Sequence, residues 1–265
     1  MKATVGNKID VMDALSKSVN IILKNPVIML PQLIVAIPVL VIDLFAKTSS
    51  PTLALGSVAS SLVTFVLTVL VIGAYPVMVK TVIDGGQISI SDAFRKGLGR
   101  FWSILAAGIL VGLFVIAGFI ALIVPGIIIV TWYAYTFPAV MLENRGAMEG
   151  MSASKAFGRD KKMSTFLMLL AVGVGFVVVG GIEVAVSAAS PVTGRVVNEL
   201  LTIPLVVWVY VLLSYTYIEY GPSSVLSSAP GTIGAPSTLA RYCPNCGKPV
   251  QVGATFCPNC GSPLT

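Results

Sequence analysis

Residues 102–142 read WSILAAGILVGLFVIAGFIALIVPGIIIVTWYAYTFPAVML, and no charged side chain interrupts them. As one helix, these 41 residues would extend about 60 Å at ~1.5 Å per residue, twice the ~30 Å of a bilayer's hydrocarbon core. The Pro125-Gly126 pair near the middle is a strong turn signal. The stretch therefore predicts two membrane-spanning helices joined by a tight turn, and not one kinked helix.

The composition of the whole chain agrees with a membrane protein. Hydrophobic residues make up 56% of it, charged residues only 11%, and the mean hydropathy is +0.93. Soluble domains have roughly 25% charged residues, so this chain cannot cover a soluble surface. Histidine is absent, which excludes Ser-His, Cys-His and His-metal sites. Paired acids and a phosphate-binding loop are also missing from the sequence, so we expect no enzyme.

Four further apolar stretches complete a set of six predicted spans, which makes the expected fold an all-α integral membrane protein. The first stretch is an unsuitable signal peptide, because it begins late and five more spans follow it. The spans are Val27–Phe45, Leu53–Val79, Trp102–Val124, Gly126–Leu142, Phe166–Ser187 and Val196–Ile218.

Basic residues alternate from one inter-span segment to the next. Segments 1–26, 80–101, 143–165 and the C-terminal tail hold 15 Lys and Arg residues, whereas the three opposite loops hold only Lys47 and Arg195. Cytoplasmic loops carry an excess of Lys and Arg in membrane proteins. The pattern therefore predicts a cell-membrane protein with both termini in the cytoplasm, and it accounts for the net charge of +6.

A short basic amphipathic segment precedes each pair of spans. These segments are Asp10–Lys24, Ser91–Arg100 and Ala147–Arg159, and Ser89-x-x-Asp92 is a possible capping box for the second. The strings Lys96-Gly-Leu-Gly-Arg100 and Lys155-Ala-Phe-Gly-Arg159 align without gaps. We expect a three-fold repeat of an interfacial helix followed by two spans, with the basic side chains at anionic lipid. Basic loops with some amphipathicity, common in membrane proteins, are the alternative.

Polar groups and helix-distorting residues within the spans bear on transport. The acids Asp43, Glu183 and Glu199 all lie near the outer ends of their spans, which disfavours a proton- or ion-coupled transporter. Prolines within spans kink helices and can frame a cavity, although they can also serve helix shape alone. The prolines are Pro31, Pro38, Pro76, Pro138 and Pro204.

Pairs of small residues four positions apart also occur within the spans, and they predict close packing between helices. The pairs are Gly108/Gly112, Ala171/Gly175 and Gly181/Ala185.

The tail holds all four cysteines, as Cys243-Pro-Asn-Cys246 and Cys257-Pro-Asn-Cys260. Four thiolates give one Zn²⁺ a closed, tetrahedral, structural site. Residues 241–265 are too few to fold on their own core, so the metal must stabilise them. Two disulfides would need an oxidising compartment, and iron is the other alternative. We therefore expect a membrane domain (1–220), a flexible Gly/Pro/Ser-rich linker (221–240) and a zinc ribbon (241–265).

Two resemblances follow from these motifs. The four cysteines, with Gly247 and Gly261 after each pair, resemble the short zinc-ribbon domains at the ends of many uncharacterised prokaryotic membrane proteins. Residues 10–218 are similar to the membrane-domain family attached to some glycerophosphoryl diester phosphodiesterases, through Val124–Glu143 and Ser154-Lys-Ala-Phe157. The second resemblance implies a fold and no activity, because the phosphodiesterase catalytic domain is missing.

The sequence favours a non-enzymatic, multi-pass membrane protein whose cytoplasmic zinc ribbon recruits or senses a protein partner. The alternative is a transporter or lipid-handling protein with an accessory ribbon, and a mid-membrane cavity lined by Pro138, Trp132 or Glu183 would support it. Membrane lipids are expected partners in both cases. Nucleic acid is an unlikely partner, because the tail carries only Arg241 and Lys248.

Overall fold

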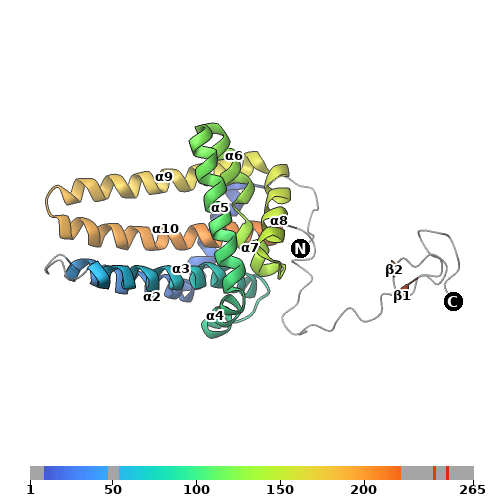
Figure 1. Cartoon of the computed structure of the whole chain (residues 1–265), viewed down its shortest axis with the longest axis horizontal. Helices are drawn as coiled ribbons and strands as arrows, with labels where there is room; N and C mark the ends of the chain where they lie inside the picture. Colours follow the sequence, from blue (N-terminus) through green and yellow to red (C-terminus); the bar gives the residue numbers. More distant parts are fainter. Residues whose placement is uncertain (1–8, 47–53, 222–240, 243–248, 251–265) are drawn as a thin grey trace. The chain divides into compact units, whose positions relative to one another are not determined.

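The computed structural model describes residues 9–46, 54–221, 241–242 and 249–250 (Figure 1). The four cysteines and the predicted linker beyond Gly221 lie outside these residues. The chain divides into two compact units, Met1–Ser227 and Ser228–Thr265, each of which is described by itself.

The first unit is helical throughout the part that the structure describes. Five of its helical segments are long and apolar enough to cross a membrane, or up to six if a pair bent by 97°, Val11–Lys24 with Pro26–Pro38, is one span. The elements are α1 (Val11–Lys24), the 3₁₀ helix η1 (Pro26–Met29), α2 (Leu30–Ala46), α3 (Ala54–Ile83), α4 (Ile90–Gly99), α5 (Phe101–Ala121), α6 (Ile123–Tyr133), α7 (Thr136–Leu142), α8 (Ala147–Asp160), α9 (Lys162–Ser187) and α10 (Pro191–Tyr220).

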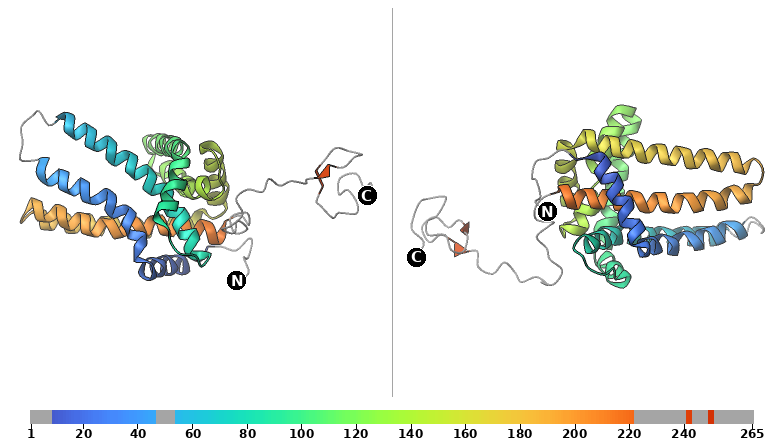
Figure 2. Two further views of the ribbon diagram at one scale, coloured as in Figure 1. Left: turned by 90° about the horizontal axis from the view of Figure 1, so that it is seen from below. Right: turned by 180° about the vertical axis from the view of Figure 1, so that it is seen from behind.

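The long helices do not all run in one direction. Helices α2, α3, α9 and α10 lie alongside one another, with α10 in contact with the other three (Figure 1). Helix α5 runs across them, and the left view of Figure 2 shows it end-on while α10 still lies lengthwise. Helices α5 and α6 pack on each other as a hairpin. Residues 102–142 thus form a helical hairpin, as predicted, but the hairpin crosses the other long helices, and the crossing of the membrane by both of its helices stays a prediction.

The turn of this hairpin differs from the prediction. Leu122 alone separates α5 from α6, and Pro125-Gly126 lies in the first turn of α6. Proline suits a first helical turn, because its missing N–H would have no helical partner there. A Cβ on Gly126 would lie 2.6 Å from the Phe119 ring. The pair therefore begins α6 and lets it approach α5 closely.

The three amphipathic segments form helices, as predicted. In the first two, the side chain of the cap residue accepts from a backbone N–H of the first turn, and in the third, the Glu149 side chain of the first turn accepts from the N–H of the cap residue Gly146. The bonds are Asp13 N to Asp10 Oδ1 (3.1 Å), Asp92 N to Ser89 Oγ (3.3 Å) and Gly146 N to Glu149 Oε2 (3.3 Å). In the second cap the Asp92 carboxylate bonds Arg95 (3.2 Å), so only half of the predicted capping box is seen.

Small residues form the buried face of all three amphipathic helices. The fourth and eighth residues after each cap are Ala14 and Ser18, Ala93 and Gly97, and Gly150 and Ser154, and all six are buried. Residues four apart share one face, and small pairs let helices approach closely. Through these faces α1 packs on α10, α4 on α3, and α8 on α6 and α7.

The small-residue pairs predicted within the spans contribute less. A Cβ on Gly175 would lie 3.0 Å from Leu205 of α10, and one on Gly108 would lie 3.8 Å from Phe137. A Cβ on Gly112 or Gly181 would meet no described atom within 4 Å. The prediction of close packing is thus confirmed at Gly175 and wrong at Gly112 and Gly181.

We expect Gly158→Ala to destabilise the protein by about 1–3 kcal/mol, because overpacking forces backbone to move. A Cβ at Gly158 of α8 would lie 2.6 Å from the Thr131 carbonyl oxygen and 3.1 Å from Trp132 Cα. The measurement is thermal unfolding of the full chain in detergent. The control is Gly99→Ala, because a Cβ at Gly99 meets nothing within 4 Å. Equal midpoints for the two variants would contradict the tight α6–α8 contact.

Candidate functional sites

The second unit contains two short strands around the first cysteine pair. Strand β1 (Arg241–Tyr242) pairs antiparallel with β2 (Pro249–Val250), with Arg241 opposite Val250. Residues 243–248, which carry Cys243 and Cys246, lie between these two strands along the chain. Four thiolates are the donor set of a closed tetrahedral zinc site.

All four predicted ligands, Cys243, Cys246, Cys257 and Cys260, lie outside the described residues. Within the described ranges, His, Cys, Asp and Glu form no group of three or more that could hold a metal. The four cysteines of the tail therefore remain the metal ligands that the sequence predicts.

In the first unit (Met1–Ser227, called the membrane unit below), the helix predicted over Gly126–Leu142 is broken. Helix α6 ends at Tyr133 and α7 begins at Thr136. Pro138 explains the break, because it lacks the N–H that the Ala134 carbonyl would accept and its ring crowds that carbonyl. Irregular backbone at membrane depth occurs only where protein buries it or where it lines a cavity.

Ser154 of α8 satisfies backbone groups on both sides of this break. Its hydroxyl donates to the Trp132 carbonyl oxygen (2.8 Å) and accepts from the Tyr135 N–H (3.1 Å). Ser154 is fully buried, and Tyr135, also fully buried, exchanges a hydroxyl–hydroxyl bond with Thr165 of α9 (3.1 Å). The amphipathic helix α8 thereby holds the broken helix in its bent shape.

Ser154→Ala should lower stability by about 1–3 kcal/mol, because it leaves buried backbone groups without their partner. The measurement is the thermal unfolding midpoint of the full chain in detergent. Ser152→Ala, at an exposed position of the same helix, is the matched control and should leave the midpoint unchanged. A Ser154→Ala midpoint equal to that of Ser152→Ala would show that the break needs no hydroxyl.

A cavity of about 220 Å³ lies beside the broken helix. Of the three residues named for the alternative function, Pro138 lines it, and Trp132 and Glu183 do not. Of the prolines predicted within spans, Pro76 and Pro138 frame it. The complete lining is Ile72, Pro76, Val111, Val115, Val130, Tyr133, Ala134, Phe137, Pro138, Leu169, Tyr210, Leu213 and Ser214.

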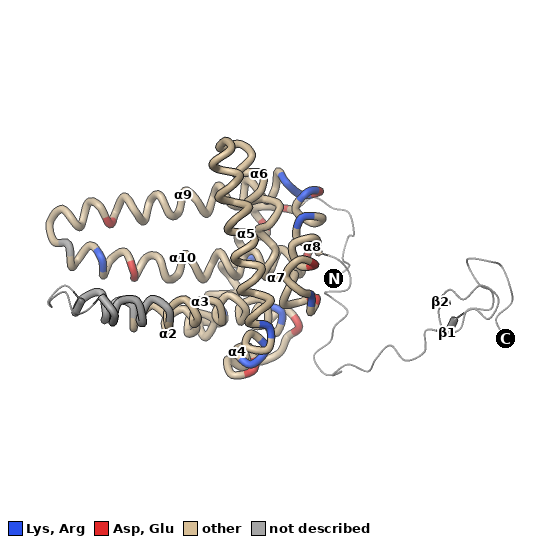
Figure 3. Tube along the Cα trace, in the orientation of Figure 1, with Lys and Arg blue, Asp and Glu red and all other residues tan. Residues whose placement is uncertain are grey.

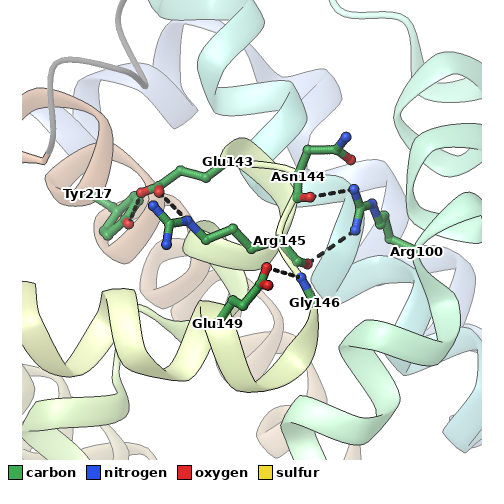
Figure 4. A network of polar contacts seen from close by, with 7 residues as sticks. All are labelled: Arg100, Glu143, Asn144, Arg145, Gly146, Glu149 and Tyr217. Carbon is green, nitrogen blue, oxygen red and sulfur yellow. Dashed lines mark hydrogen bonds and ion pairs between the residues drawn. The ribbon is translucent and has the colours of Figure 1, made fainter. Parts of the chain in front are cut away.

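A polar network at the C-terminal end of α7 includes side chains from α10, from the junction of α4 and α5, and from the loop between α7 and α8 (Figure 4). The Glu143 side chain, only 4% exposed, pairs with Arg145 Nε at 2.6 Å and accepts a hydrogen bond from the Tyr217 hydroxyl of α10. The Arg100 guanidinium donates to the carbonyl oxygens of Asn144 (2.6 Å) and Arg145 (3.1 Å). Asn144 has φ 55°, a conformation that asparagine tolerates better than most residues.

This network ties the loop between α7 and α8 to α10 and to the junction of α4 and α5. The Glu143 carboxylate is engaged by a guanidinium and a phenol, which suits a structural clamp better than a general base. Sequence reasoning assigned no site role to Arg100, Glu143, Arg145, Ser154 or Tyr217. Among them only Ser154 had a visible signal, the spacing of small residues after the helix caps.

Comparison with known proteins identifies one part of the chain. A family model of the zinc-ribbon domain matches residues 242–264. No curated protein and no solved structure matches the chain. The cysteine-rich tail is thus similar to zinc-ribbon domains, which indicates zinc binding. The resemblance of residues 10–218 to the phosphodiesterase-associated membrane domain finds no support.

Proposed function

We propose that this protein is a non-enzymatic, multi-pass membrane protein that presents a zinc ribbon in the cytoplasm to recruit or sense a protein partner. The carrying observation is the zinc-ribbon match at residues 242–264, beyond a unit rich in helices suited to cross a membrane. Four thiolates close the coordination sphere of zinc, so such a site stabilises a small binding surface and offers no open position for catalysis.

The distribution of charge supports the cytoplasmic placement. Among the described residues, Lys and Arg gather at the end of the long helices where α4 and α8 lie (Figure 3). Basic residues favour the cytoplasmic side. The α5–α6 hairpin returns the chain to the side from which it started, whether it crosses the membrane or only enters it. The proposed orientation therefore does not depend on a count of exactly six spans.

We also propose that the membrane unit consists of three copies of one element, an amphipathic helix followed by two apolar helical segments. The common cap spacing of the buried small residues supports this proposal. So does the packing order, in which α4 lies on α3, α8 on α6 and α7, and α1 on α10. Helices α4 and α8 thus each contact the second apolar segment of the preceding copy. Helix α1 of the first copy contacts α10, the second apolar segment of the third copy.

Capture of partners in living cells tests the recruitment. Full-length protein with an N-terminal affinity tag is crosslinked in cells, purified and compared with a Cys243→Ser/Cys246→Ser variant by quantitative mass spectrometry. The matched control is Ser262→Ala, which changes the tail without touching a cysteine. We expect at least one protein to be enriched by the natural chain and by Ser262→Ala only. Identical captured sets for all three chains would refute the recruitment.

The apolar cavity favours a second function, the handling of lipid. Its lining contains no charged side chain, so an apolar ligand is the chemically matched one. In that case the ribbon would be an accessory module.

A further inference from the structure

We infer that the cavity beside the broken helix binds one hydrocarbon chain of a membrane lipid, which enters from the bilayer between α5 and α9. The inference rests on the second function proposed above, lipid handling, and does not depend on what the ribbon binds.

The chemistry of the lining selects the occupant. Among the lining side chains, only Tyr133, Tyr210 and Ser214 carry a polar atom, and none is charged. A buried water needs two to four polar partners, and an apolar cavity of about 150 Å³ stays dry and accepts a small hydrocarbon. The cavity here, at about 220 Å³, is larger. The apolar lining therefore matches a hydrocarbon chain, and the volume accommodates a segment of one.

The surroundings of the cavity indicate the route of entry. The lining residues Val115 of α5 and Leu169 of α9 are half-buried. Their chain neighbours are exposed apolar side chains: Phe114 (48%), Ile116 (58%) and Leu170 (51%). Exposed apolar side chains on both helices are stable against lipid and unstable against water. We therefore place the opening toward the hydrocarbon of the membrane, between α5 and α9.

The walls resist collapse, which keeps the space available. Pro76 and Pro138 restrict two of the wall-forming helices, and Ser154 holds the bend between α6 and α7 from outside the cavity. An empty apolar cavity lowers stability in proportion to its volume. A chain that fills the cavity would therefore stabilise the fold as well as bind.

Photolabelling tests the inference on the full-length protein in phosphatidylcholine nanodiscs. The probe is a phosphatidylcholine with a diazirine within one acyl chain, and adducts are mapped by mass spectrometry. We expect adducts at Tyr133 and Tyr210, in addition to those on the lipid-facing surface at Val177, which is 75% exposed. Val115→Phe should reduce the cavity adducts about tenfold, because the ring displaces roughly two methylenes of the chain.

Ile120→Phe is the matched control, since it adds the same ring to the same helix at a side chain that is 81% exposed and does not line the cavity. It should retain cavity labelling, and both variants should retain labelling at Val177. Absence of label at Tyr133 and Tyr210 while Val177 is labelled would overturn the inference, as would equal cavity labelling of both variants.

Three further experiments separate the remaining explanations. A photoreactive free fatty acid that labels the cavity when the phosphatidylcholine probe does not would overturn the membrane-lipid source. The Cys243→Ser/Cys246→Ser variant should keep its cavity labelling, so failure of partner recruitment and failure of lipid binding are distinguishable. Delipidated Val115→Phe should unfold at or above the temperature of the natural chain, because cavity filling stabilises; a large decrease would show that the cavity is not open space.

Discussion

Full-length protein purified under reducing conditions should carry one zinc ion per chain, and Cys246→Ser should abolish the bound zinc. Structural zinc contributes about 10–16 kcal/mol in small zinc-dependent domains, more than any other single interaction available to residues 241–265. The tail should therefore lose its folded structure with the metal. Elemental analysis of the protein measures zinc per chain, and limited proteolysis measures the folding of the tail.

A chelator provides the second half of this experiment. It should open new cleavage sites within residues 241–265 and leave digestion of Met1–Ser227 unchanged, because the two are separate compact units. Ser262→Ala should bind zinc like the natural chain. Four free thiols without zinc, a stoichiometric iron, or two disulfides found by intact mass would each contradict the zinc assignment.

Arg145→Ala should destabilise the membrane unit by about 3 kcal/mol, the lower end of the range for removing one partner of a buried ion pair. The Glu143 side chain is only 4% exposed, so it would keep a buried charge with Tyr217 as its remaining partner. The lower end applies because the Arg145 side chain itself is 43% exposed. The expected decrease in the unfolding midpoint is roughly 10 °C.

Two comparisons identify the cause of this effect. Arg95→Ala breaks an exposed pair, with side chains 82% and 57% exposed, and should cost less than about 1 kcal/mol. Adding Glu143→Gln to Arg145→Ala should restore much of the loss, because the neutral amide removes the unpaired charge. A midpoint for Arg145→Ala equal to that of Arg95→Ala would show that the Glu143 carboxylate is not effectively buried.

The sequence was sufficient to predict the helices, because their signals are local. Apolar runs and the periodicity of Asp10–Lys24 predicted helices that the structure contains, and α4 (Ile90–Gly99) begins and ends one residue from the predicted Ser91–Arg100. The spacing of the cysteines predicted a zinc ribbon, which the family match supports. Both successes rest on patterns within a few residues of each other.

Features that depend on contacts between distant segments were not predicted. Hydropathy reports the length of α5 but not its direction across α10. Pro138 accounts for the break between α6 and α7, but the hydroxyl that bonds the backbone at the break belongs to Ser154, which lies 22 residues from Trp132 along the chain. Pro125-Gly126 was expected to form a turn, because Pro-Gly is a strong local turn signal. Sequence alone did not show that Gly126 packs against Phe119.

The two basic strings that suggested the repeat show how a local similarity can mislead, because they align residues with different surroundings. The basic strings align Gly99 with Gly158, yet a Cβ at Gly99 meets nothing while one at Gly158 would meet the Thr131 carbonyl oxygen. Alignment by helix caps instead matches Gly97 with Ser154, both of which are buried. The position of the cap determines which face of a helix is buried, and the basic residues lie on the other face.

The cytoplasmic placement of the ribbon is tested most directly by reporter fusions in cells. One reporter follows Thr265, and another is inserted at Ser190, between α9 and α10. The predicted result is a cytoplasmic signal after Thr265 and an external signal at Ser190. A cytoplasmic signal at Ser190, or an external signal after Thr265, would contradict a zinc ribbon presented to partners inside the cell.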